Sequence, residues 1–69
     1  MKLSARNVLK GKVKNIREGT VNSEVIVQLA GGLELVSIIT KPSIDNLNLK
    51  EGNDIYAIIK ATNIILGAD

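Results

Sequence analysis

Cysteine and histidine are both absent from this chain of 69 residues. Without cysteine no disulfide can form, and without either residue type the usual protein ligands of zinc are missing. The serines and threonines have no histidine to activate them, and the carboxylates show no paired spacing on one predicted element. The composition therefore argues against a disulfide scaffold, a metal site and an enzyme.

Aromatic residues are almost as scarce, because Tyr56 is the only one and there is no Phe or Trp. Proteins that bind single-stranded nucleic acid stack bases on aromatic side chains. Nine Lys and Arg are interspersed with seven Asp and Glu, which leaves a net charge of only +2 and no basic tail. We therefore expect no nucleic-acid partner.

Long apolar runs are also missing, so nothing in the sequence predicts a membrane span. Residues Met1–Ser4 lead directly into strand-like sequence, without the apolar segment of a signal peptide. The absence of cysteine is compatible with a reducing compartment. We expect a cytoplasmic protein with no membrane partner.

Aliphatic residues, by contrast, are abundant. Hydrophobic residues make up 45% of the sequence, and almost all of them are Ile, Leu and Val. A chain this short rarely buries enough surface to offset an ordering cost of about 1.5 kcal/mol per residue. Because disulfides and metals are excluded, we expect oligomerisation, with part of the aliphatic surface lying between subunits.

Alternation of apolar and polar residues predicts a series of strands. A long first strand is expected around Leu9–Ile16, and Gly11 within it marks either a bend or a close backbone approach. A second strand is expected over Val21–Leu29. A turn at Ala30–Gly32, which needs glycines with positive φ, leads into a third strand over Leu33–Thr40.

A short helix should begin at Pro42, since proline suits the first helical turn. A fourth strand is expected over Ile55–Lys60 and a short fifth strand over Asn63–Leu66. The resulting order β-β-β-α-β-β is typical of the OB fold, so the sequence predicts an all-β, five-stranded barrel with one short helix. We expect a single domain over residues 1–69.

Two short segments near opposite ends of the chain are rich in hydrogen-bond donors. Ser4 offers a hydroxyl, Ala5 and Arg6 offer backbone N–H groups, and Lys60 offers an ammonium group. Together they could hold a tetrahedral dianion. The alternative is that Ser4–Asn7 is only the polar entry to the first strand and that Lys60 is an ordinary solvated lysine.

Five stretches extend this pattern over nearly the whole chain: Ser4–Val13, Val21–Val25, Ser37–Thr40, Leu49–Gly52 and Ala57–Leu66. In these stretches, and in their order, the chain resembles the molbindins, or Mop family, of small oxyanion-binding proteins. The family is built on the OB fold and assembles as a hexamer, a trimer of dimers, with sites between subunits. The resemblance implies a homo-oligomer of that kind.

The resemblance also implies a ligand and its site. It points to the binding of molybdate, and of tungstate as its analogue, for intracellular storage and homeostasis, with no other cofactor. The implied molybdate contacts are Ser4, Ala5, Arg6, Lys60, Ala61 and Thr62. A second anion site is implied at Val21, Asn22 and Ser23, which in the family approach a symmetry axis, and Ser37 is an additional contact.

An alternative function comes from a different class. The chain would then be an oligomeric structural or regulatory interaction module of the OB type, whose anion site is vestigial or sensory. Regulatory members of the family attach the same domain to a DNA-binding segment or an ATPase. Neither accompanies these 69 residues, so we expect the binding protein.

Overall fold

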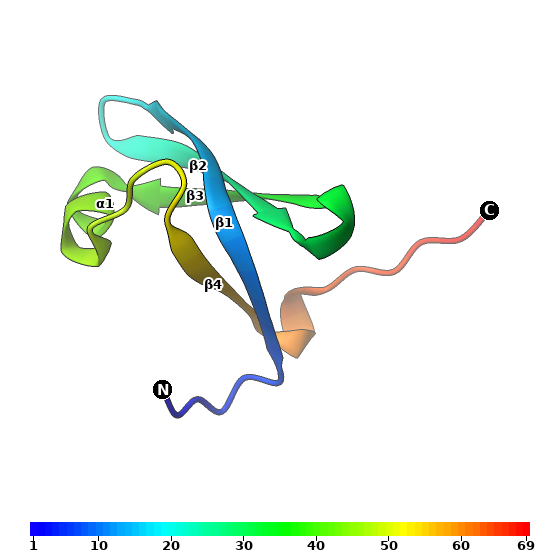
Figure 1. The fold of residues 1–69 in the computed structure, drawn as a ribbon. Coiled ribbons are helices and arrows are strands. Elements are labelled where there is room, and N and C mark those ends of the chain that lie inside the picture. Colours follow the sequence, from blue (N-terminus) through cyan, green and yellow to red (C-terminus); the bar gives the residue numbers. More distant parts are fainter.

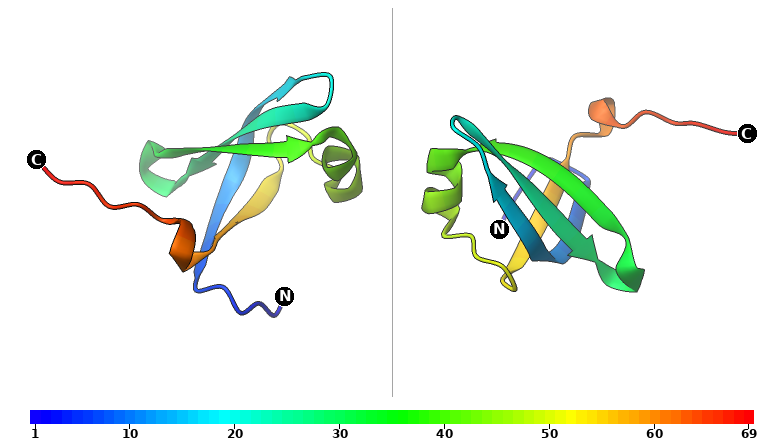
Figure 2. Two further views of the ribbon diagram at one scale, coloured as in Figure 1. Left: turned by 180° about the vertical axis from the view of Figure 1, so that it is seen from behind. Right: turned by 90° about the horizontal axis from the view of Figure 1, so that it is seen from above.

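The computed structural model describes residues 1–69 and consists mostly of β-structure. Its four strands form one antiparallel sheet in the order β3-β2-β1-β4, which curls into a half-barrel (Figures 1 and 2). The predicted fold class is thus confirmed. Along the chain the elements are β1 (Asn7–Glu18), β2 (Asn22–Leu29), η1 (Ala30–Gly32), β3 (Glu34–Thr40), α1 (Lys41–Leu47), β4 (Asp54–Ile59) and η2 (Ala61–Asn63), where η denotes a 3₁₀ turn.

The core lies where the inner face of the sheet meets the helix. Val13 of β1 and Val25 and Val27 of β2 are buried, and Ile44 of α1 packs against them. Residues spaced by two along a strand point to the same face, which explains why the alternation in β2 predicts these buried positions. Only five of the 69 residues are buried, so the core is small.

Local signals fix the ends of α1. The Thr40 hydroxyl accepts a hydrogen bond from the Ser43 N–H at 3.3 Å, and Pro42 occupies the first turn, as predicted. Asn48 ends the helix with a positive φ of 53°. No helix in the structure is both long and apolar enough to cross a membrane.

The pairing irregularity of β1 lies a few residues beyond Gly11. The pairing of β1 with β2 shifts register between Val13 and Asn15, which marks a β-bulge. Gly11 instead permits a close approach between strands. A Cβ atom added there would lie 2.6 Å from the Gln28 carbonyl oxygen and 2.8 Å from Val27 Cγ1.

The predicted fifth strand over Asn63–Leu66 is also wrong. The Asn63 N–H donates to the Lys60 carbonyl at 2.9 Å and the Ile64 N–H donates to the Ala61 carbonyl at 3.3 Å. These bonds form η2, and the chain then leaves the sheet without pairing (Figure 1). The apolar run has the composition of a strand, but it meets no partner strand in its own chain. The sheet therefore has four strands, and β3 and β4 are unpaired edges.

Substitution of Gly11 tests the close approach of β1 and β2. Gly11→Ala should destabilise the protein by about 1–3 kcal/mol, because the methyl group would collide with backbone that cannot move aside cheaply. Chemical denaturation at equal protein concentrations measures the change. Gly67→Ala is the matched control, since nothing lies within 4 Å of an added Cβ there. Equal stability of the Gly11→Ala variant and the parent would contradict the packing.

Candidate functional site

Pairing of β1 with β4 brings the two predicted anion-binding segments to the same end of the sheet. The last pair in this ladder is Asn7 with Ile59, and the Asn7 side-chain amide donates to the Ile59 carbonyl at 3.2 Å. Residues 4–6 directly precede this pair on one strand and residues 60–62 directly follow it on the other (Figure 1). We call these six residues the donor end. The two segments flank the same end of the ladder within one chain, although Asn7 and Ile59 are 52 positions apart.

The polar side chains of the donor end form no interactions that hold the fold together. Ser4, Arg6, Lys60 and Thr62 are exposed, and their side chains make no hydrogen bond or ion pair. The backbone hydrogen bonds outside the helices and strands include none donated by Ala5 or Arg6. The donor end thus carries two uncompensated cations and several unused donors.

The chemistry of the donor end suits an anion that only accepts hydrogen bonds. Hydroxyl, amide, ammonium and guanidinium groups all donate, and neither segment contains an Asp or Glu. In the single chain these groups face water, which competes with them and weakens their attraction for an anion. A tight site here therefore requires a neighbouring surface that excludes water.

The second predicted site lies at the opposite end of β1, where Ser23 pairs with Glu18. Val21 and Asn22 are exposed. Ser23 is buried, and its hydroxyl is the one buried side-chain oxygen without a hydrogen-bond partner. The structure therefore does not bring residues 21–23 together with the donor end, and only two of the three face solvent.

Ser37 lies on β3 opposite Val25 and lines an apolar groove between the two edge strands. This inner groove has a volume of about 420 Å³, and 12 of its 13 lining residues are hydrophobic. Ser37 is the exception. It is thus surrounded by apolar side chains and is not part of the donor end. The other lining residues are Val25, Val27, Leu35, Val36, Ile39, Leu47, Leu49 and residues 55–59.

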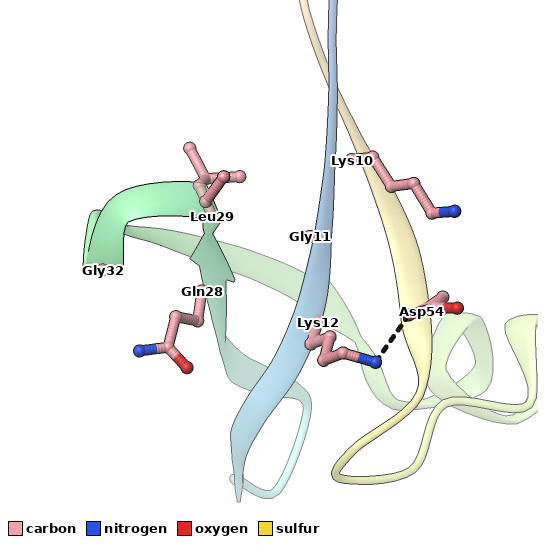
Figure 3. A pocket seen from close by; sticks show the side chains of 8 residues that line it. Lys10, Gly11, Lys12, Gln28, Leu29, Gly32 and Asp54 are labelled. Atoms are coloured by element: carbon pink, nitrogen blue, oxygen red, sulfur yellow. Dashed lines mark hydrogen bonds and ion pairs between the residues drawn. The ribbon is translucent and has the colours of Figure 1, made fainter.

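A hollow of about 330 Å³ lies around Gly11 and was not predicted (Figure 3). Lys10 and Lys12 of β1 extend beside Asp54 of β4, while Gln28 and Leu29 lie on the other side of Gly11. Lysines spaced by two share one face of a strand, which is the sequence signal for this cluster. Lys12 Nζ lies 3.0 Å from Asp54 Oδ1, so a carboxylate already compensates this cation.

The two lysines also affect how Asp54 titrates. The hydrogen bond from Lys12, followed by the positive charges of Lys12 and Lys10, lowers the pKa of the Asp54 carboxyl below its ordinary value. Asp54 thus stays ionised and competes with any external anion for Lys12. The donor end, which has no acid, is the better anion site.

Comparison with known proteins identifies the family of this chain. The TOBE domain model matches residues 3–66. Molybdenum-pterin-binding protein 3 of Clostridium pasteurianum is 46% identical over 66 residues, which cover 96% of this chain and 97% of that protein. The chain belongs to the Mop family of TOBE domains. The resemblance to the molbindins is thereby confirmed.

Solved structures of molybdate-binding proteins share the fold. A molybdate-binding protein from Sporomusa ovata aligns with a TM-score of 0.92 at 38% identity, over 99% of this chain and 100% of that one. The cytoplasmic molybdate-binding protein ModG, with molybdate bound, aligns with a TM-score of 0.96 at 49% identity. That match covers all of this chain and 49% of ModG, so this chain spans about half the length of ModG.

Titration of Asp54 tests the electrostatics of the Gly11 hollow. Its midpoint, followed by NMR, should lie below that of an ordinary aspartate, and Lys12→Ala should raise it. Because the folded-state pKa is lowered, the associated stabilisation is present above the unfolded-state pKa and is lost as the pH falls through the folded-state pKa. Lys14→Ala, which removes a pair with Glu34, should leave the midpoint unchanged. An unaltered midpoint in Lys12→Ala would refute the assignment.

Proposed function

We propose that this chain binds molybdate, with tungstate as an analogue, and stores it in the cytoplasm to maintain its homeostasis. The observation that carries the proposal is the donor end, where two unpaired cations and unused donors flank one end of the β1–β4 ladder and neither segment contains an acid. Relatives named as molybdenum-pterin-binding and molybdate-binding proteins support it. We propose a single binding domain over residues 1–69 rather than an enzyme, with no further cofactor and no nucleic-acid or membrane partner.

Each group of the donor end has a proposed role. Ser4 and Thr62 donate through their hydroxyls, Ala5, Arg6 and Ala61 through backbone N–H groups, and Lys60 through its ammonium group. Molybdate at neutral pH is a fully deprotonated dianion, so all of its oxygens accept and none donates. Hydrogen bonds in which one partner is charged are the strong ones, which favours a dianion over neutral ligands.

The same donors should discriminate between oxyanions. Hydrogen phosphate carries a proton that a site built only of donors cannot satisfy. Sulfate has the charge of molybdate but shorter bonds, so it would leave some donors unpaired. An unpaired buried donor costs about 1–3 kcal/mol. The site would thus discriminate against hydrogen phosphate through its proton and against sulfate through its smaller size.

The proposal includes an assembly and a second site. We propose a hexamer, as a trimer of dimers, whose subunits cover the donor end and exclude water from it. Residues 21–23 are a second anion site, supported by the exposure of Asn22 and the unpartnered hydroxyl of Ser23. Ser37 is an additional contact, since the residue is exposed and its hydroxyl makes no hydrogen bond in the single chain.

Removal of the Lys60 charge tests the site directly. A hydrogen bond to a charged group is worth about 1.5–3 kcal/mol, so Lys60→Ala should lower molybdate affinity by about one to two orders of magnitude in calorimetric titration. Ser4→Ala should lose less, since a neutral donor contributes about 0.5–1.5 kcal/mol. Lys14→Ala is the control, because Lys14 is paired with Glu34 outside the donor end. If Lys60→Ala assembles and binds like the parent, the site is elsewhere.

Competition between oxyanions tests the chemistry of the ligand. Molybdate and tungstate should bind much more tightly than sulfate, and phosphate should hardly bind, because only donors line the site. Competition titrations with the four anions measure this order. Equal affinity for phosphate would mean that the site contains an acceptor. An oligomer that binds none of them would favour the alternative of a structural or regulatory module.

A further inference from the structure

One side-chain hydrogen bond links the two strands beside the donor end. The Asn7 side-chain amide donates to the Ile59 carbonyl at 3.2 Å, and both residues are partly buried. Asn7 directly follows Arg6, and Ile59 directly precedes Lys60. The other side-chain hydrogen bonds lie elsewhere in the molecule. Because the β1–β4 ladder ends at this pair, the Asn7 amide closes the ladder next to the donor end.

Backbone carbonyls are the groups that would most weaken an anion site at this position. A carbonyl oxygen accepts hydrogen bonds and cannot donate, so a carbonyl that faces a fully deprotonated oxyanion would repel it. Residues 59–61 place three carbonyl groups in or next to the donor end. A site for such an anion therefore needs these carbonyls to be paired elsewhere.

All three carbonyls are paired. Hydrogen bonds from the N–H groups of residues 63 and 64 pair the carbonyls of Lys60 and Ala61. The Ile59 carbonyl precedes this turn, and the Asn7 side chain pairs it instead. In a trans peptide the carbonyl and the following N–H point in opposite directions. The three bonds therefore also orient the N–H groups of residues 60–62, none of which donates in the backbone hydrogen bonds outside the helices and strands.

We propose that Asn7 is a positioning residue for anion binding. Its amide holds the Ile59 carbonyl in the ladder, which keeps an acceptor out of the donor end and orients the Lys60 N–H. This role rests on the proposed function, because it belongs to the same site. It differs from the roles of the six donor-end residues, since Asn7 acts through the Ile59–Lys60 peptide and need not touch the anion.

Removal of the Asn7 amide should cause a specific defect. The Ile59 carbonyl would lose its partner and become free to turn toward the donor end. A free carbonyl would repel molybdate but would accept the proton of hydrogen phosphate. Molybdate affinity and discrimination against phosphate should therefore be lost together. A purely structural role would weaken both anions alike, because both depend on the same donors.

Asn7→Leu tests this role, because leucine is close to asparagine in size but has no donor. In competition titrations at mildly alkaline pH, where molybdate and hydrogen phosphate carry the same charge, molybdate affinity should fall about tenfold. Phosphate affinity should not fall, so the ratio of the two affinities should shrink. Asn46→Leu is the matched control, since Asn46 is exposed on α1 and its side chain makes no hydrogen bond. An unchanged ratio in Asn7→Leu would overturn the proposal.

Asn7→Asp is a second variant that keeps the shape of the side chain. Its carboxylate cannot donate, so the affinity ratio should shrink again, while the added charge acts on both dianions alike. Circular dichroism and light scattering establish that each variant folds and assembles. A parent-like ratio in Asn7→Asp would likewise contradict the role of Asn7, and the proposed function would stand without it. If the parent itself binds no molybdate, the proposed function fails and the role of Asn7 fails with it.

Discussion

The structure depends on the pairing of β1 along both of its edges. Its first half pairs with β4 from Asn7 to Lys12, and its second half pairs with β2 from Gly11 to Glu18. A strand that is central in this way needs a bulge to follow the curl of the sheet and a glycine where the neighbouring backbone comes close. The same pairing also carries residues near the two termini to one end of the molecule, where the donor end forms.

A second constraint is the small size of the core. Four apolar side chains are buried, and no disulfide or metal cluster supplements them. A chain of this length then depends on further apolar burial for its stability. The open groove and the exposed Ile64–Leu66 segment are both consistent with that need. In the proposed assembly, oligomerisation and anion binding would be linked, because the exposed Ile64–Leu66 segment closely follows residues 60–62 of the donor end.

Local patterns predicted most of the fold. The alternation in Val21–Leu29 identified the buried face of β2, and Pro42 marked the first turn of α1. The glycines of Ala30–Gly32 adopt the positive φ that their turn requires, 83° and 87°. The prediction of a fifth strand was wrong because an apolar run becomes a strand only beside a partner edge. No local pattern encodes whether such an edge is available within the chain.

The site was less accessible from sequence than the fold. The donor chemistry of Ser4, Arg6 and Lys60 could be read from residue types, but their proximity follows from the β1–β4 register, which depends on tertiary pairing. The lysine pair around Gly11 was missed because Lys10 and Lys12 look like ordinary solvated strand residues until Asp54 is placed beside them. Burial of Ser23 likewise depends on the packing of β2 between β1 and β3.

The most direct test of the account is to locate the ligand. Crystals grown with molybdate, measured at the molybdenum absorption edge, should give an anomalous difference peak between residues 4–6 and residues 60–62. A peak confined to the Gly11 hollow, beside Lys10 and Lys12, would contradict the assignment of the donor end. A fully assembled protein with no molybdenum peak would contradict molybdate binding itself.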